Sequence, residues 1–469
     1  MSASRRPHAL SRRPWTAALA ALLLFSAALW AGETAASGAT QSGTGVAPGS
    51  LDEAGELPPV ALISDTHYLA RGLYDGGEAF GRMISSGDGK DTVHMDALLS
   101  ALAYGLPKPS ILIITGDLSF NGELESHREF ATRLRSLRAA GVRTYVLPGN
   151  HDIDNPWARS YLGRTARKVP SVSAAQFASI YQDAGFSEAF SRDSAGLSYA
   201  VRPAPGLTLI LLDSTVHDGN IKAGSPEASG YIAESTQKWL AARLDEAHAR
   251  GDRTIIAAHH NFITHNYMFE EGYTLDNADD VLSLLAAHGQ TWTLSGHIHI
   301  QSAVRASDGR TSVTDIATGS FAVNPHNCAI IRYDKKGDCF HYDAVPVDVE
   351  RWAAAAGVKD PVLRGYSSWS AGYFGGFAER LMDSLIKADG ASLSAGQAAA
   401  LRSFLSELNI SFFAGRVEGA ERTRLLDSEG FRLLKSLPPS FLSLYADSIL
   451  SDPPELDSSH LVLKAAPLR

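Results

Sequence analysis

Short apolar runs of strand length recur over the first two thirds of the chain, and five of them end directly in residues with metal-binding atoms. The runs cover residues 59–63, 111–115, 144–148, 254–258 and 291–294. The residues that follow them read Asp65-Thr66-His67, Gly116-Asp117, Gly149-Asn150-His151-Asp152, His259-His260-Asn261 and Gly296-His297-Ile298-His299. Functional sites in open α/β sheets form outside the carboxyl ends of the strands, so the pattern predicts that these residues meet in one site.

Amphipathic segments at residues 125–140, 235–250 and 277–288 separate the apolar runs, and a glycine follows each segment as a helix-ending signal. Further apolar runs at residues 207–213, 312–317, 329–333 and 339–343 predict additional strands. The alternation predicts an α/β (α+β) domain at residues 58–348, organised as a two-sheet sandwich flanked by helices. The order of the strands does not follow from the pattern.

The pattern changes after about Val349, where helical periodicity replaces the strand runs. Helices are expected at residues 371–387, 394–409, 428–436 and 439–451, and Ser394 with Gln397 fits a capping box. We therefore predict a helical domain at residues 349–469 that packs on the first domain. It contains an aromatic run that could bind a ligand, although burial between the domains is favoured: Tyr366, Trp369, Tyr373, Phe374 and Phe377.

The N-terminal residues have the layout of a secretory signal peptide, with four arginines before an uncharged run at residues 15–30 and small residues after it. The run is shorter than the roughly 20 residues that a membrane-spanning helix needs, so cleavage is favoured over a stable membrane anchor. We expect a signal peptide at residues 1–36, a flexible linker at 37–57, and a periplasmic or secreted protein. Export by the general or the twin-arginine route stays open, since Arg12-Arg13 fits the latter in part.

The chain has 469 residues, of which 45% are hydrophobic, and a formal net charge of −9. This composition supplies ample core material and makes binding of a nucleic-acid polymer unexpected. Cys328 and Cys339 flank an expected hairpin turn at residues 334–337, which would place Cys339 opposite Arg332 and Cys328 opposite Asp343. The two cysteines are then not opposed, and no disulfide is expected.

Two inserts interrupt the strand pattern. Residues 71–95 form a glycine-rich acidic segment for which a solvated loop is favoured over a calcium site, with Asp75, Asp88, Asp91 and His94 as its candidate ligands. Residues 153–200 contain a helix expected at 174–184, capped by Ser173. We expect this second insert to form a lid or a wall beside the site.

The donors at the strand ends mix carboxylate, amide and imidazole groups: Asp65, His67, Asp117, Asn150, His259, His297 and His299. This mixture suits first-row ions such as iron, manganese or zinc. Seven ligands are too many for one ion with an open position, and they suit two ions that share a carboxylate.

The ordered set of motifs resembles the calcineurin-like metallophosphoesterase superfamily over residues 59 to about 300. The resemblance implies that Asp65, His67 and His299 hold one ion, that Asn150, His259 and His297 hold the other, and that Asp117 bridges them. It also implies that His151 is a non-ligand histidine near the leaving group. Asn261 stands where the family's pattern has a proline, so either His259 or His260 could be the ligand, with His259 preferred.

The reaction implied is the in-line attack of a metal-bridging hydroxide on phosphorus, with His151 stabilising or protonating the leaving oxygen. Asp152 could orient that imidazole or cap the following turn. Several neighbours could touch the substrate or support the ligands, namely His260, Asn261, His265, Asn121 and Tyr68.

A closer resemblance, to bacterial exported cyclic-nucleotide phosphodiesterases with a C-terminal helical domain, covers nearly the whole mature chain. It is carried by residues 65–69, 87–90, 149–157 and 412–415 together with His259-His260-Asn261. It implies a small phosphoester substrate, with 2′,3′- or 3′,5′-cyclic nucleotides as leading candidates. An exported phosphomonoesterase or nucleotidase that scavenges phosphate is the alternative, and a non-catalytic envelope-binding protein is another. The oligomeric state stays open.

Overall fold

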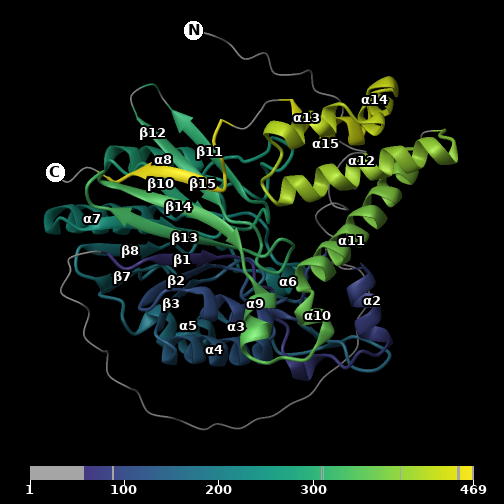
Figure 1. Ribbon diagram of the computed structural model, residues 1–469. Coiled ribbons are helices and arrows are strands. Elements are labelled where there is room, and N and C mark those ends of the chain that lie inside the picture. Colours follow the sequence, from purple (N-terminus) through teal and green to yellow (C-terminus); the bar gives the residue numbers. More distant parts are fainter. Residues whose placement is uncertain are drawn as a thin grey trace.

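The computed structural model describes residues 57–86, 89–307, 309, 311–390, 392–451 and 455–466, so the predicted signal peptide and nearly all of the linker lie outside it. Two β-sheets form stacked layers with helices outside them, and the C-terminal helices project to one side (Figure 1). In the described part of the chain, no helix is long and apolar enough to cross a membrane.

The first sheet contains the first three of the five strands that lead to the metal-binding motifs. In it β1 pairs in parallel with β2, β2 in parallel with β3, and β13 antiparallel with β1. Its order is β15 (His460–Lys464), β14 (Cys339–Pro346), β13 (Asn327–Asp334), β1 (Val60–Ile63), β2 (Ser110–Thr115) and β3 (Val142–Leu147).

The second sheet contains the other two, β9 and β10, which are parallel neighbours. Its order is β11 (Ser302–Ser307), β12 (Ser312–Ala317), β10 (Trp292–Ser295), β9 (Arg253–Ala257), β8 (Leu207–Leu211), β7 (Tyr199–Ala204) and β6 (Ser191–Arg192). A separate small ribbon joins β4 (Arg159–Ser160) to β5 (Arg167–Lys168).

The inner faces of the two sheets share one hydrophobic core, in which Leu62 and Ile113 of the first sheet join Leu294 and Ile316 of the second. Every residue of β1 and β2 is buried, which is why these strands are apolar almost throughout, with Ser110 and Thr115 at the ends of β2, instead of alternating. The predicted two-sheet α/β sandwich is confirmed.

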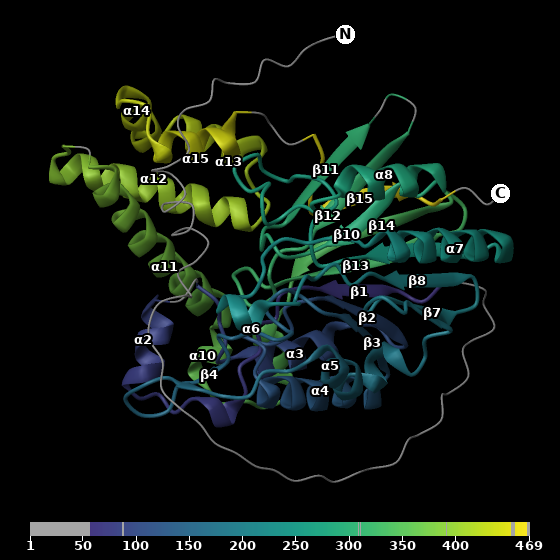
Figure 2. The same ribbon diagram turned by 180° about the vertical axis from the view of Figure 1, so that it is seen from behind.

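Helices cover the outer faces, with α3, α4 and α5 against the first sheet and α7 and α8 against the second (Figures 1 and 2). The helices of this part are η1 (Arg71–Leu73), α2 (Glu78–Ser86), α3 (Met95–Gly105), α4 (Leu124–Ala139), α5 (Ala174–Ile180), η2 (Gln182–Phe186), α6 (Asn220–Ala223), α7 (Glu234–Arg250) and α8 (Ala278–Ala287).

Of the C-terminal helices, the first two join the main core through Val349 and Val362, and the others pack around a second hydrophobic cluster that reaches Ile298 and Ile300 beside the metal-binding motifs. The C-terminal helices are α9 (Val349–Ala355), α10 (Pro361–Arg364), α11 (Tyr366–Asp389), α12 (Ala395–Phe413), α13 (Gly419–Leu426), α14 (Glu429–Ser436) and α15 (Phe441–Leu450). The capping box of Ser394 and Gln397 at α12 is confirmed.

The segment after α15 corrects the expectation of an all-helical C-terminus. Strand β15 leaves the helices and pairs antiparallel with β14 at the edge of the first sheet. Its alternation of exposed and buried residues spans five residues, too short a signal to stand out behind four helical segments.

Local expectations for the β13–β14 hairpin and for the two inserts also need correction. The β13–β14 hairpin places Cys339 opposite Asp334 and Cys328 opposite Val345, because Asp338 takes the left-handed turn position (φ 48°). Both cysteines are nevertheless free, as expected. The acidic insert contains helix α2 and buries Asp91, which contacts His94 and Tyr366 and is therefore not a solvated loop carboxylate.

The insert at residues 153–200 forms a wall of the site only through its first residues. Its helix is capped by Ser173 as predicted but ends at Ile180, and it packs on α4 away from the strand ends. Trp157, near the start of the insert, does line the cavity described below.

Candidate metal centre

The five strand ends converge, and all seven predicted donors meet at one edge of the sandwich. Six of them are buried, and His299 is partly exposed. Sequence position alone does not bring them together, because β1, β2 and β3 belong to one sheet and β9 and β10 to the other.

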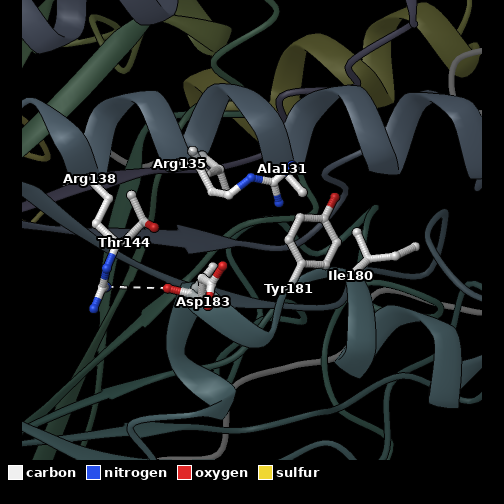
Figure 3. Close-up of a pocket in the computed structure, with 9 residues that line it drawn as sticks. Ala131, Arg135, Arg138, Thr144, Ile180, Tyr181 and Asp183 are labelled. Atoms are coloured by element: carbon white, nitrogen blue, oxygen red, sulfur yellow. Dashed lines mark hydrogen bonds between the residues drawn. The ribbon is translucent and has the colours of Figure 1, made fainter. Parts of the chain in front are cut away.

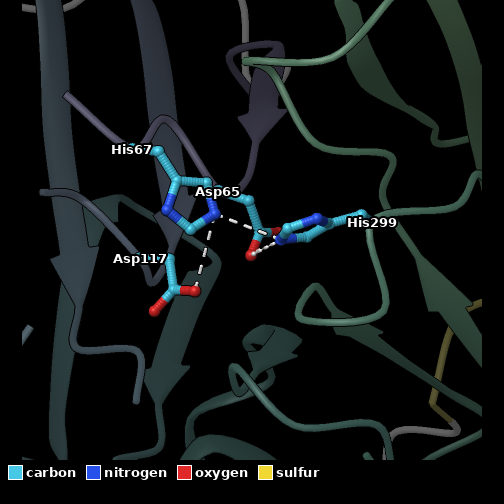
Figure 4. A group of neighbouring side chains, drawn as sticks. All are labelled: Asp65, His67, Asp117 and His299. Carbon is cyan, nitrogen blue, oxygen red and sulfur yellow. Dashed lines mark hydrogen bonds and ion pairs between the residues drawn. The ribbon is translucent and has the colours of Figure 1, made fainter. Parts of the chain in front are cut away.

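A first group consists of Asp65, His67, Asp117 and His299, whose ligand atoms all lie within 4.8 Å of one another (Figure 4). His67 Nε2 is 3.1 Å from His299 Nε2 and 3.7 Å from Asp117 Oδ2. His299 Nε2 lies 3.3 Å from Asp65 Oδ1. The side chains point toward a common centre, from β1, from β2 and from the loop after β10.

A second group consists of Asp117, His259 and His297, again within 4.8 Å. His259 Nε2 is 3.1 Å from both Asn150 Oδ1 and His297 Nδ1, and 3.5 Å from Asp117 Oδ1. Asp117 therefore belongs to both groups, and its two oxygens face different histidines.

Hydrogen bonds set which ring nitrogens face the centre. His259 Nδ1 donates to the Thr115 carbonyl at 2.7 Å, and His297 Nε2 donates to the Gly272 carbonyl at 2.7 Å. The opposite nitrogens are left with lone pairs toward the cluster, as metal-binding histidines require. Both ring nitrogens of His260 are engaged elsewhere, by Ser214 and Ala228, so the geometry favours His259 as the ligand.

The backbone around the cluster is strained. Asp65, His67, Asp117, His297 and His299 all have positive φ, between 41° and 66°. Non-glycine residues rarely adopt this region, and such strain concentrates at functional sites. The conformation turns each donor back over the end of its strand.

Two glycines are required by close approach. A Cβ on Gly149 would lie 2.2 Å from Asp117 N and Oδ1, and one on Gly296 would lie 2.0 Å from Ser64 Oγ. The glycines of the Gly-Asn-His-Asp and Gly-His-x-His motifs therefore let neighbouring loops touch.

The electrostatics favour a bound cation. Burial raises the pKa of Asp117 to about 7, reinforced by the charges of Asp65 and Asp152 and opposed by His259. Burial and then the charge of Lys90 hold the pKa of His67 well below its usual range, so this imidazole is neutral. A cation would relieve the cost of a buried carboxylate and would bind a neutral imidazole.

The donor set fits first-row metal ions. Where two histidine nitrogens face each other, they cannot both carry a proton, and a cation between them would use both lone pairs. Asp65 Oδ1 is buried and accepts no hydrogen bond among the described residues, although the His299 Nε2 atom lies 3.3 Å away as an ion-pair contact. Nitrogen and oxygen donors in these proportions suit iron, manganese or zinc.

His151 borders the cluster without joining it, with its ring 5.4 Å from that of His67. Asn121 Oδ1 lies 2.9 Å from His151 Nδ1 and so orients the ring. The Asp152 carboxylate accepts hydrogen bonds from the backbone of Leu118, Ser119 and Gly149. These donors all precede Asp152 in the chain, so the carboxylate ties the loop after β2 to its own turn instead of capping the turn that follows.

Among the described residues, the side-chain hydrogen bonds of Tyr68, Asn261 and His265 go to supporting residues and not to side chains of the seven donors. The Tyr68 hydroxyl donates to Asp96 and Glu129 on the helices and not toward the cluster. Asn261 bonds to Ser295 and Gly296, which supports the loop that carries His297. His265 is held by Ser302 and Asp315, so its hydrogen bonds support the loops around the cluster.

A cavity of about 1630 Å³ opens over the cluster, larger than most small-molecule sites. Asp117, Asn150, His151, His297 and His299 line its floor. A second hollow, crossed by a bond from Arg138 to the Asp183 carbonyl, measures about 10 Å³ and holds at most a water (Figure 3). The large cavity is therefore the candidate binding site.

Two functional candidates were missed. Lys90 is buried, lines the cavity and places positive charge near His67. Asp315 is fully buried and accepts hydrogen bonds from Phe262 N and Ser295 Oγ. Phe262 belongs to the loop after His259, and Ser295 comes shortly before His297. Lys90 belongs to the segment 87–90 that carries the closer family resemblance, so the sequence indicated its importance. Asp315 lies inside an apolar strand run, and no sequence motif marks it.

The chain belongs to the calcineurin-like phosphoesterase family, because the model of that family matches residues 58–301, more than half of the chain. Residues 348–455 match the C-terminal domain of cyclic nucleotide phosphodiesterase. The family resemblance inferred from the motifs is confirmed.

Two relatives share part of the chain. A protein named 3′,5′-cyclic-nucleotide phosphodiesterase from Nostoc sp. is 27% identical over 205 residues, which is 43% of this chain and 60% of the relative. A protein named "Probable cyclic nucleotide phosphodiesterase" from Rhodopseudomonas palustris is 24% identical over 240 residues, 51% of this chain and 70% of the relative. The chain thus spans less than two thirds of the first relative.

Among solved structures, a dimetal phosphatase from Danio rerio matches with 16% identity and a TM-score of 0.42. The match covers 62% of this chain and 96% of that chain.

Proposed function

We propose that the protein is a metal-dependent phosphodiesterase acting on small phosphoesters, with 2′,3′- or 3′,5′-cyclic nucleotides as its substrates. The observation that carries the proposal is the position of Asp117, whose Oδ2 faces His67 and whose Oδ1 faces His259. One carboxylate shared by two donor groups is the arrangement that a two-ion centre needs. The names of the relatives support a phosphodiester substrate.

Asp65, His67 and His299 would hold one ion, Asn150, His259 and His297 the other, with Asp117 between them. Two first-row ions, iron, manganese or zinc, supply Lewis acidity to a phosphoryl oxygen and to water. The protein holds the reacting groups through the strained turns that fix each donor.

His151 and Lys90 act on the substrate itself in this proposal. His151 lines the cavity with its Nδ1 bonded to Asn121, and in this proposal its Nε2 holds a proton for the leaving oxygen. Lys90, in the same cavity, attracts the negative phosphate.

Outside the metal centre, the charge of the cavity lining disfavours a second negative charge on the substrate. Lys90 is the one lysine or arginine among the described residues that line the cavity, whereas Glu270, Glu271 and several aspartates also line it. A diester carries a single negative charge near neutral pH and a monoester approaches two. The acidic lining therefore repels a monoester more strongly than a diester, and it opposes the attraction that bound cations would exert on both.

The test compares purified, manganese-loaded protein on bis-p-nitrophenyl phosphate, p-nitrophenyl phosphate and the two cyclic adenosine phosphates. We expect kcat/KM to be higher for the diesters, with cyclic nucleotides hydrolysed. Preference for the monoester would overturn the proposal in favour of a phosphatase. Turnover of none of them, together with capture of an envelope partner, would favour a non-catalytic role.

We also infer that the protein acts in the periplasm or outside the cell. The support is the arginine-rich start, apolar run and small residues of the first 36 positions. Fractionation of the producing bacterium with mass analysis of the intact protein tests this. A cytoplasmic protein that retains these residues would contradict export.

A further inference from the structure

The C-terminal helices form one wall of the large cavity over the metal centre. Three half-buried phenylalanines contribute to this wall, Phe377 from α11 and Phe412 and Phe413 from the end of α12. A half-buried aromatic wall that borders the same cavity as a metal centre suits a ligand with a flat apolar part.

Helix α11 is locked onto the loop that carries Lys90. Gly89 has a positive φ of 79°, and a Cβ there would lie 2.7 Å from Phe374 Cδ2 and 2.8 Å from Phe377 Cδ1. The Tyr373 hydroxyl also donates to the Lys90 carbonyl at 3.3 Å. Phe377 therefore packs against the loop that carries Lys90.

Helix α12 is locked onto the other side of the centre. The Phe413 carbonyl accepts a bond from Gln301 N at 3.0 Å, two residues beyond His299. A Cβ on Gly415 would lie 2.5 Å from the Gln301 carbonyl, so the chain can approach only with glycine there. Phe413 is thereby tied to the loop of a candidate metal ligand.

Phe374 joins the two anchors. It is 1% exposed, and its ring centroid lies 5.8 Å from Phe377 and 5.4 Å from Phe413. The buried ring fixes its two neighbours from behind, while both of them border the cavity. The result is a rigid aromatic row held between the Lys90 loop and the His299 loop.

We propose that Phe377 and Phe413 form a platform on which the nucleobase stacks when the phosphate of a cyclic nucleotide lies at the metal centre. This inference rests on the proposed function and assigns the helical domain a role in substrate recognition. Stacking on an aromatic face tolerates any base, so the platform selects nucleotides over base-free phosphodiesters without reading the base.

The test uses Phe377→Leu and Phe413→Leu, which keep apolar volume but remove the flat ring. Phe431→Leu is the matched control, since Phe431 is a half-buried phenylalanine of the same helical domain that packs on Phe404. KM is measured for adenosine 3′,5′-cyclic phosphate and for 1-O-methylribose 3′,5′-cyclic phosphate, which lacks the base. Equilibrium binding of adenosine monophosphate is measured in parallel.

We expect each platform variant to raise KM for the nucleotide and Kd for adenosine monophosphate by roughly 10-fold. The base-free substrate and the control variant should be unaffected. Equal effects on both substrates, or none on either, would overturn the platform while the proposed function stands. Ring-dependent binding of adenosine monophosphate without any turnover would instead overturn the proposed function and keep the platform; neither binding nor turnover would overturn both.

Discussion

The side-chain oxygen of Asn121 lies 2.9 Å from Nδ1 of His151. Because a carbonyl oxygen only accepts hydrogen bonds, it places the proton of the neutral imidazole on Nδ1. Asn121 N is in turn bonded to the buried carboxylate of Glu123, which holds the loop in place.

Asn121→Ala should leave the metal content unchanged and lower kcat by about 10-fold, because His151 loses its orientation. The loss should be greatest for substrates with poor leaving groups, such as ribose hydroxyls, and small for p-nitrophenolate. His151→Ala should show the same dependence with a larger loss. Equal slowing of all substrates in both variants would contradict a leaving-group role.

Asp117→Asn should remove metal from both donor groups and nearly abolish turnover, since one neutral amide replaces the carboxylate that both groups share. Elemental analysis and turnover of bis-p-nitrophenyl phosphate measure the two effects. Asp91→Asn is the matched control, a buried aspartate that contacts Tyr366 and should keep both metals. Two bound ions and a normal rate in the Asp117 variant would refute the shared ligand.

Asp315→Asn should weaken the loops that carry His259 and His297, because Asp315 Oδ2 accepts from Phe262 N at 2.8 Å and Ser295 Oγ at 3.1 Å. An amide nitrogen placed there would face donors. We expect a loss of about 2–4 kcal/mol in the free energy of unfolding by urea. Metal titration should show weaker binding at the second donor group than at the first, and equal weakening would argue for a general loss of stability.

Glu123→Gln should flatten the pH dependence of stability. Burial raises the pKa of Glu123 from 4.5 to about 7. Between these values the folded protein holds more protons than the unfolded one, so the free energy of unfolding falls as pH rises through this window. The neutral variant lacks this fall.

Urea unfolding of both metal-free proteins at pH 5 and pH 8 measures the effect. The free energy of unfolding of the variant minus that of the wild type should be about 1–3 kcal/mol more favourable to the variant at pH 8 than at pH 5. The Asp117 carboxylate also has a raised pKa of about 7 but is present in both proteins, so its contribution cancels. The same difference in unfolding free energy between the two proteins at both pH values would contradict the raised pKa of Glu123.

The sequence by itself determined most of the strands, the seven candidate donors that the structure brings together and the cap of α12, because each depends on local apolar period or short-range motifs. It also determined that Cys328 and Cys339 do not pair, although the predicted register was offset.

Only the tertiary structure decided what lies around those donors. The partition of five strands between two sheets, the two faces of Asp117, and the approach of Lys90 and Phe413 to the centre join residues far apart in the chain. The same holds for β15, which returns to the first sheet after the helical domain. The hydrophobic periodicity of a segment indicates which of its residues are buried. Which residues they contact depends on how the sheets and helices pack, and this packing produces no periodic pattern in the sequence.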